Sequence, residues 1–325
     1  MAMANIEGNY RQFSAGGRGE VHTPNHKRIK GVTLSSFMEM IIAHLHSIGK
    51  QRTSETYQAT LRSFMEFRKG REVMIHNIDS ELLQMYEAYL LNKGLKRNTS
   101  SFYLRVLRAV YNRALEDNLI IDQRPFRHVY LGIDETTRRA ISLEDIRKIK
   151  ALDLEENWSL AFARDMFLFS FYTRGMSFVD MAYLMKTDVS SGVLSYSRRK
   201  TGKQLIVGWE GCMQSIVDQY YDNESEYLLP IITVADIDAR KQYLKKSYQV
   251  NKSLKKIGRM IQLSLPLTMY VARHSWASVA RDKNIPLSVI SEGMGHNSQL
   301  TTQIYLTSIK SSEVDKANKL ILKFL

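Results

Sequence analysis

The sequence predicts a mainly helical protein with a small β-hairpin, an α+β class, divided into two domains. The chain has 325 residues, a length that suggests about two domains, and its hydrophobic content of 44% is enough for two cores. Apolar residues recur at helical spacing over much of the chain. Residues 193–196 and 205–209 are short apolar segments on either side of Lys200-Thr201-Gly202-Lys203, which indicates a strand, a turn made by glycine and a second strand.

The first domain is expected over residues 32–131, behind a polar arm formed by residues 1–31. The arm contains Gly16-Gly17 and the basic run His26-Lys27-Arg28, which is typical of a flexible or extended segment. After the arm, apolar stripes at helical spacing predict four helices joined by short polar connections, the pattern of a small bundle. These stripes cover residues 38–48, 57–68, 82–90 and 104–115, and the second helix is expected to begin after Thr53 or Ser54.

The second domain is expected over residues 141–325, after a polar linker at residues 132–140. Ser142 is followed three residues later by Asp145, the pattern of a helix start. Residues 160–171 are strongly apolar and predict a buried helix, and the hairpin follows it. Further helices are expected from about Val271, and residues 312–323 form a final amphipathic pattern.

The charge of the chain predicts a polyanionic partner. The formal net charge is +13, so nucleic acid is the first candidate and a membrane surface is the competitor. No apolar run approaches the length of a membrane span, and Cys212 is the single cysteine, which excludes an internal disulfide and a thiolate metal site within one chain. These features favour a cytoplasmic protein. Acidic clusters with metal-ligand spacing are also missing, so we expect no metal and no cofactor, and phosphoryl chemistry that relies on side-chain cations.

Basic residues border the helices of the first domain. Scattered lysines and arginines are usually a solvated helix face, but the overall charge favours a face that follows DNA phosphates. The residues expected to contact DNA are Lys50, Arg52, Arg97, Arg105 and Arg108.

Five residues of the second domain have the chemistry needed to hold and attack a phosphodiester: Arg174, Lys200, Arg273, His296 and Tyr305. Arginine offers a planar fork to two phosphate oxygens, histidine moves a proton near neutral pH, and tyrosine can form a covalent phosphoryl intermediate. Each residue also has a plain explanation: a surface ion pair, an exposed turn, a cap or simple packing. One shared site is the better hypothesis, because separate explanations would need five coincidences.

The order and context of these residues resemble the tyrosine recombinases, also called the phage integrase family. The resemblance rests on Tyr172-Thr173-Arg174-Gly175, on Lys200 in Arg-Arg-Lys-Thr-Gly between two strands, on Ala272-Arg273-His274, and on Met294-Gly295-His296 with Tyr305 nine residues later, after Thr301-Thr302. Residues 33–128 resemble, more loosely, the SAM-like helical domain of the family. The stretch from Thr99 to Asn118 is similar to integrases carried by mobile elements of Bacteroides-type bacteria.

The resemblance implies a site-specific recombinase that integrates, excises or inverts DNA through a 3′-phosphotyrosyl intermediate at Tyr305. It implies that Arg174 and Arg273 hold the phosphate, that Lys200 protonates the leaving 5′-oxygen, and that His296 donates to the phosphate or moves a proton. Tyr270 stands where the family usually has histidine. A phenol is a poor base at neutral pH, so the resemblance does not assign a general base at this position. Asp180 is expected to support Arg174 or Lys200.

The resemblance also implies partners and leaves alternatives. Double-stranded DNA sites are the expected substrate, with a homotetramer on DNA, accessory DNA-bending factors and a nucleoid location. Leu320, Ile321 and Leu325 suit docking of the C-terminal helix on a neighbouring protomer, and packing on its own chain is the equal alternative. The alternative functions are a type IB-like DNA topoisomerase, with a similar residue set acting as a monomer, and a DNA-binding regulator without catalysis.

Overall fold

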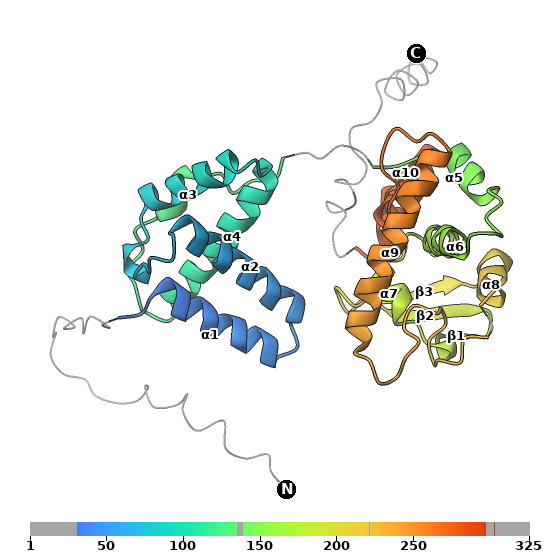
Figure 1. The fold of residues 1–325 in the computed structure, drawn as a ribbon, viewed down its shortest axis with the longest axis horizontal. Helices are drawn as coiled ribbons and strands as arrows, with labels where there is room; N and C mark the ends of the chain where they lie inside the picture. The colour runs from blue at the N-terminus through green and yellow to red at the C-terminus, as the bar shows by residue number, and fades with distance from the viewer. Residues whose placement is uncertain (1–30, 135–138, 221, 297–301, 303–325) are drawn as a thin grey trace, which may run out of the picture. The chain divides into compact units, whose positions relative to one another are not determined.

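The structure is a computed structural model that describes residues 31–134, 139–220, 222–296 and 302. It divides into an N-terminal unit, Met1–Asp134, and a C-terminal unit, Glu135–Leu325. The predicted arm apart from Gly31, part of the predicted linker, Tyr305 and the predicted final helix lie outside the described residues. The predicted fold class is confirmed: both units are mainly helical, and the C-terminal unit adds a small sheet (Figure 1).

The N-terminal unit is a helical bundle around one core. Phe64 and Tyr86 are fully buried in it, with ring centroids 5.1 Å apart, and the Tyr86 hydroxyl donates to Ser63 Oγ at 2.9 Å. Each of the four predicted helices is present, and the second begins at Gln51, earlier than Thr53. The helices are α1 (Leu34–Ser47), α2 (Gln51–Phe67), α3 (Ser80–Asn92) and α4 (Arg97–Glu116), with 3-10 turns η1 (Ile75–Asn77) and η2 (Pro125–His128).

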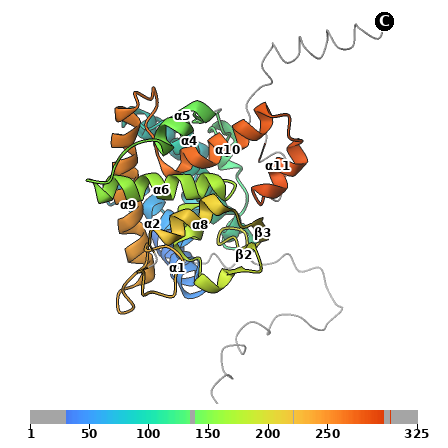
Figure 2. The same cartoon turned by 90° about the vertical axis from the view of Figure 1, so that its right-hand side faces the viewer.

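The C-terminal unit is built around the apolar helix α6 (Trp158–Tyr172). This helix is buried over most of its surface and packs against α9 (Ala239–Met260), α10 (Met269–Asp282), α5 (Leu143–Lys150) and α8 (Gly211–Asp218) (Figure 2). The predicted start of α5 is confirmed, because Ser142 and Asp145 form a capping box. The other elements are α7 (Phe178–Ala182), η3 (Lys186–Asp188), β1 (Val189–Ser190), β2 (Val193–Ser197), β3 (Gln204–Gly208) and α11 (Leu287–Gly293).

The predicted hairpin is present as two strands of a three-stranded antiparallel sheet in the order β1-β2-β3. Ser197 pairs with Gln204 at the end of the ladder, and residues 198–203 form the turn. Gly202 has φ +69°, so it supplies the left-handed turn residue that the sequence indicated. The short strand β1 was not predicted.

Among the described residues, no helix is both long enough and apolar enough to cross a membrane.

Candidate active site

Arg174 is placed by the way in which α6 ends. The helix closes with two consecutive left-handed residues, Arg174 (φ +62°) and Gly175 (φ +75°). The amide of Gly175 donates back to the carbonyl of Ser170 at 2.7 Å, so the helix stops in a tight turn. A left-handed arginine is strained, and such strain is typical of functional sites. The half-buried Arg174 donates from Nη1 to the carbonyl of Ile206 in β3 at 3.2 Å.

Gly175 brings the end of α6 against α10. A Cβ on this residue would lie 2.6 Å from Arg273 Cα and 2.9 Å from Arg273 Cβ, which no side chain could tolerate. The two arginines of the predicted site therefore lie on backbone segments in direct contact, although 99 positions separate them in the sequence.

Arg273 is 6% exposed and held by fixed acceptors. Its Nη1 donates to the carbonyl of Gly175 at 2.8 Å, and its Nη2 donates to the carbonyl of Met294 at 2.7 Å. The same Nη2 lies 2.9 Å from Nε2 of His296. A guanidinium held in this way is oriented before any ligand arrives, which is the arrangement that stabilises developing charge most effectively.

His296 is 7% exposed and comes directly after Gly295, three residues beyond the end of α11. Burial, together with the positive charges of Arg273, Arg198, Lys200 and Lys203, lowers the pKa of His296 from the ordinary 6.5 to about 4. The imidazole is therefore uncharged at neutral pH. Its Nδ1 lies 2.7 Å from Oγ1 of the fully buried Thr302.

The hairpin turn carries Lys200 and is fastened to the segment that carries His296. Arg198 Nη1 donates to the carbonyl of Gly295 at 2.9 Å, and Lys203 Nζ donates to Glu292 Oε2 at 2.7 Å. Gly295, with φ +64°, lies so close to Leu205 that a Cβ would come within 2.8 Å of it. Lys200 itself is exposed and makes no ion pair with the described residues, so its ammonium group is available.

Asp180 is hydrogen-bonded to the same turn. Its carboxylate accepts from the backbone amide of Arg199 at 2.9 Å and from Ser177 Oγ at 2.6 Å, and the residue is 4% exposed. The Arg199 guanidinium stacks on Tyr183, 3.8 Å from the ring centroid. Asp180 thus contacts the residue next to Lys200, and its role as a support stays a prediction.

Tyr270 lies in the first turn of α10 and is 46% exposed. Its ring packs edge-on against His274, with centroids 4.5 Å apart. Burial and the charges of Arg139 and Arg273 lower the pKa of His274 to about 4. The structure thus places Tyr270 beside the helix start, and its part in the chemistry stays a prediction, as does that of Tyr305, which lies outside the described residues.

The predicted DNA contacts all lie on the N-terminal unit. Arg97, Arg105 and Arg108 share one face of α4, because their spacings of eight and eleven residues differ from whole turns by less than a quarter turn. Arg97 stacks on Tyr130 at 3.6 Å and lies 3.5 Å from Asp134, whereas Arg108 is exposed. Lys50 and Arg52, also exposed, lie at the start of α2.

Sequence reasoning missed the long helix α9. Its 22 residues contain eight lysines and arginines and no aspartate or glutamate. Val250, Leu254 and Ile257 recur at helical spacing and are buried, so the signal of an amphipathic helix was present in the sequence. The exposed side carries Lys241, Lys245, Tyr248, Lys252, Lys255, Lys256 and Arg259.

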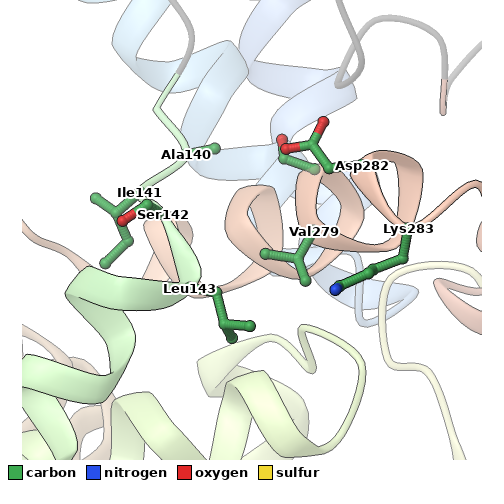
Figure 3. A pocket seen from close by; sticks show the side chains of 8 residues that line it. Ala140, Ile141, Ser142, Leu143, Val279, Asp282 and Lys283 are labelled. Carbon is green, nitrogen blue, oxygen red and sulfur yellow. The ribbon is translucent and has the colours of Figure 1, made fainter.

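A separate hollow of about 300 Å³ lies between the start of α5 and the second half of α10 (Figure 3). Ile141, Leu143 and Val279 give it an apolar lining, and Asp282 and Lys283 stand at its edge. None of the predicted catalytic residues lines this hollow, so the arginine cluster is a different site. Among the described residues, no three histidine, cysteine or acidic side chains are grouped to hold a metal ion.

Both units of the chain are similar to known proteins. The chain matches the family model of the phage integrase SAM-like domain over residues 33–130 and that of the phage integrase family over residues 164–311. It is 25% identical over 272 residues to the tyrosine recombinase XerC of Pelotomaculum thermopropionicum, covering 78% of this chain and 87% of that protein. It is 26% identical over 276 residues to XerC of Rickettsia felis, covering 79% of this chain and 87% of that protein.

Solved structures of integrases are similar to this chain in fold. A lambda integrase dimer bound to a COC′ core site gives a TM-score of 0.64 at 16% identity and covers 84% of this chain and 95% of its own. The Tn1549 transposon integrase in complex with transposon right end DNA gives a TM-score of 0.66 at 14% identity, covering 90% and 100%. A lambda integrase tetramer bound to a Holliday junction gives 0.62 at 16% identity, covering 86% and 78%.

Proposed function

Because this chain belongs to the phage integrase family and is a tyrosine-type site-specific DNA recombinase, we propose that Tyr305 is its nucleophile and that Arg174, Arg273 and Lys200 form the phosphate site. The observation that carries this proposal is the convergence of four separate segments. The end of α6, the start of α10 and the end of α11 bring Arg174, Arg273 and His296 together. The hairpin turn that carries Lys200 is bonded to the same segment through Arg198, and the charge of Lys200 acts on His296.

The proposed reaction exchanges one phosphoester for another. The Tyr305 hydroxyl attacks the scissile phosphorus, a tyrosyl–phosphate bond forms, and the bond to the 5′-oxygen breaks. Arg174 and Arg273 bind the non-bridging oxygens, whose charge grows in the transition state. Lys200 gives its proton to the departing 5′-oxygen. The 5′-hydroxyl of another strand reverses these steps, so rejoining needs no external energy.

Lys200 is the better acid of the two lysines in the turn. Lys203 is held in an ion pair with Glu292, while Lys200 is exposed. This difference supports the assignment made from the sequence.

Both units contribute phosphate contacts in this proposal. On the N-terminal unit these are Lys50, Arg52 and the basic face of α4. On the C-terminal unit the exposed lysines of α9 add a second basic face, since a helix with no acidic residue attracts a polyanion along its whole length. Because the proposed substrate is DNA and the net charge is +13, a nucleoid-associated location also belongs to this proposal.

Assembly as a tetramer on two DNA sites, with the C-terminal helix docked on a neighbour, belongs to the same proposal, as does carriage by a mobile element. The lambda integrase tetramer on a Holliday junction is a protein of similar fold that supports the tetramer. Mass measurement of the protein on a four-way junction, with and without residues 312–325, tests it. Loss of the tetramer with retained DNA binding by the shortened chain is the expected result.

The nucleophile is tested by covalent trapping. Denaturant-resistant protein–DNA complexes are isolated, the DNA is sequenced and the linked peptide is mapped. We expect a peptide containing Tyr305, no covalent complex with Tyr305→Phe, and nearly unchanged DNA binding, because affinity comes from spread phosphate contacts. Tyr243→Phe, at a half-buried tyrosine that packs on Tyr183, is the matched control. A linked peptide containing Tyr270, or recombination by Tyr305→Phe, would contradict the proposal.

A further inference from the structure

Thr302 links the histidine of the site to the segment that leads to the nucleophile. It is fully buried, and it lies three residues before Tyr305 in the sequence. Its Oγ1 is 2.7 Å from His296 Nδ1, while His296 Nε2 is 2.9 Å from Arg273 Nη2. Threonine, histidine and arginine thus form a continuous chain of three groups.

The chemistry of the arginine fixes the direction of these bonds. A guanidinium can donate but cannot accept, so Nε2 of His296 must present a lone pair to Arg273. An imidazole with its lone pair on Nε2 carries its proton on Nδ1. Nδ1 is therefore the donor to Thr302, and the hydroxyl oxygen is the acceptor.

The surroundings of the ring agree with this form. Within the part of the chain that the structure describes, the charged groups that act on His296 are Arg273, Arg198, Lys200 and Lys203, all positive. With burial, they lower the pKa of the imidazole to about 4, so that the ring is neutral at pH 7 and keeps the lone pair. A protonated ring would instead place an N–H against the N–H groups of Arg273.

We infer that Thr302 is a positioning residue that holds His296 in the Nδ1–H form, so that Nε2 accepts from Arg273 and fixes the guanidinium. This inference rests on the proposed function of the same site and concerns the protein before DNA binds. In the free protein the imidazole joins the carbonyls of Gly175 and Met294 as a third acceptor around Arg273. It also ties the segment before Tyr305 to the arginine that holds the phosphate.

Nitrogen NMR of the free, full-length protein tests the tautomer directly. Long-range ¹H–¹⁵N spectra of protein labelled at histidine distinguish the Nδ1–H form, the Nε2–H form and the imidazolium, and His296→Gln identifies the signals. We expect neutral Nδ1–H at pH 7, unchanged in Thr302→Ser and altered in Thr302→Val. An Nε2–H ring, an imidazolium, or a Thr302→Val spectrum identical to that of the parent protein overturns the inference.

Single-turnover cleavage of the trapped DNA sequence gives the second readout. Thr302→Val keeps the size and burial of the side chain but removes the acceptor, and we expect cleavage to fall roughly 10- to 100-fold, as when a partner that orients a functional histidine is lost. Thr302→Ser restores the hydroxyl and should stay within a few-fold of the parent. Thr60→Val is the matched control, since Thr60 is fully buried and donates to Thr56 in α2.

The two proposals fail separately. Failure of the tautomer test in a protein that still links DNA to Tyr305 overturns the role of Thr302 alone. If Thr302→Val does not fold, the spectra of the parent protein and of Thr302→Ser still decide the tautomer.

Discussion

The arginines of the two units differ in how they are held, and the difference separates binding from chemistry. Arg97 and Arg108 of the N-terminal unit are exposed, whereas Arg273 and Arg198 of the C-terminal unit are 6% and 8% exposed and bonded to backbone carbonyls. Exposed cations adjust to a phosphate and are screened by salt. A guanidinium fixed by carbonyls cannot adjust, so it favours the one geometry in which the transition-state charge develops.

The largest effect is expected where the fixed geometry is broken and the charge is kept. Lysine in place of Arg273 cannot bond to Gly175, Met294 and His296 together. We expect Arg273→Lys to lower single-turnover cleavage by about 10²–10³ with DNA affinity nearly unchanged. The matched control is Arg108→Lys, at an exposed arginine of α4, which should cleave normally. If Arg273→Lys cleaved DNA within tenfold of the parent rate, fixing of the guanidinium would not be what separates the catalytic arginine from the exposed ones.

The next effect concerns Lys200, an exposed cation in the unit of fixed ones. As the acid for the leaving group, it should matter for normal DNA and much less when sulfur replaces the bridging 5′-oxygen, because a thiolate leaves without a proton. We expect Lys200→Ala to be rescued on the 5′-thio substrate and Arg174→Ala to stay inactive. Lys203→Ala, which loses the bond to Glu292, is the control. Equal defects of Lys200→Ala on both substrates would assign the acid role elsewhere.

A smaller effect is expected from the buried histidines as the pH falls. The pKa values of His274 and His296 are lowered from 6.5 to about 4, so between these values the unfolded chain binds more protons than the folded chain. The contribution of these two histidines to the free energy of unfolding is therefore at its full value above about pH 6.5, and it is lost as the pH falls towards 4.

Urea unfolding between pH 4.5 and 7.5 measures this change. His296→Gln should reduce the dependence of the unfolding free energy on pH, and His46→Gln, at an exposed residue of α1, should not. An unfolding free energy that rises as the pH falls would contradict the sign.

The smallest effect belongs to the exposed arginines of α4. The double variant Arg97→Ala, Arg108→Ala should weaken DNA binding and lower the slope of log affinity against log salt by about 1.8, with the cleavage rate of bound DNA unchanged. Arg113→Ala is the control, because Arg113 lies sixteen residues after Arg97, on nearly the opposite side of the helix, and pairs with Asp117. An equal change of slope for Arg113→Ala would show that no one face of α4 binds.

Local patterns in the sequence predicted most of the fold. Periodic apolar stripes located α1 to α4, Ser142 with Asp145 located the start of α5, and the two strands around Lys200 have nearly the predicted limits. The site was found through side-chain chemistry and a resemblance. Neither the side-chain chemistry nor the resemblance could predict the left-handed conformation of Arg174, the contact of Gly175 with Arg273, or the bond of Arg198 to Gly295. These features arise where segments far apart in the sequence meet.

The long helix α9 was missed for a different reason. Its apolar residues are sparse among eight basic ones, so a search for apolar stripes passes over them. The absence of any acidic residue in these 22 positions is the clearer sequence signal of α9. This signal points to the binding of a polyanion and not to the packing of the fold.

The contact between Gly175 and Arg273 limits how this protein can be redirected to new DNA sequences. In a library in which every position is varied and survivors are sequenced, codon 175 should return glycine almost alone, because any larger residue would push α10 and its arginine away from the end of α6. Codons for the exposed face of α9 should return more residues than codon 175, since those side chains are exposed. A library meant to change the DNA target should therefore leave codons 175 and 295 unchanged.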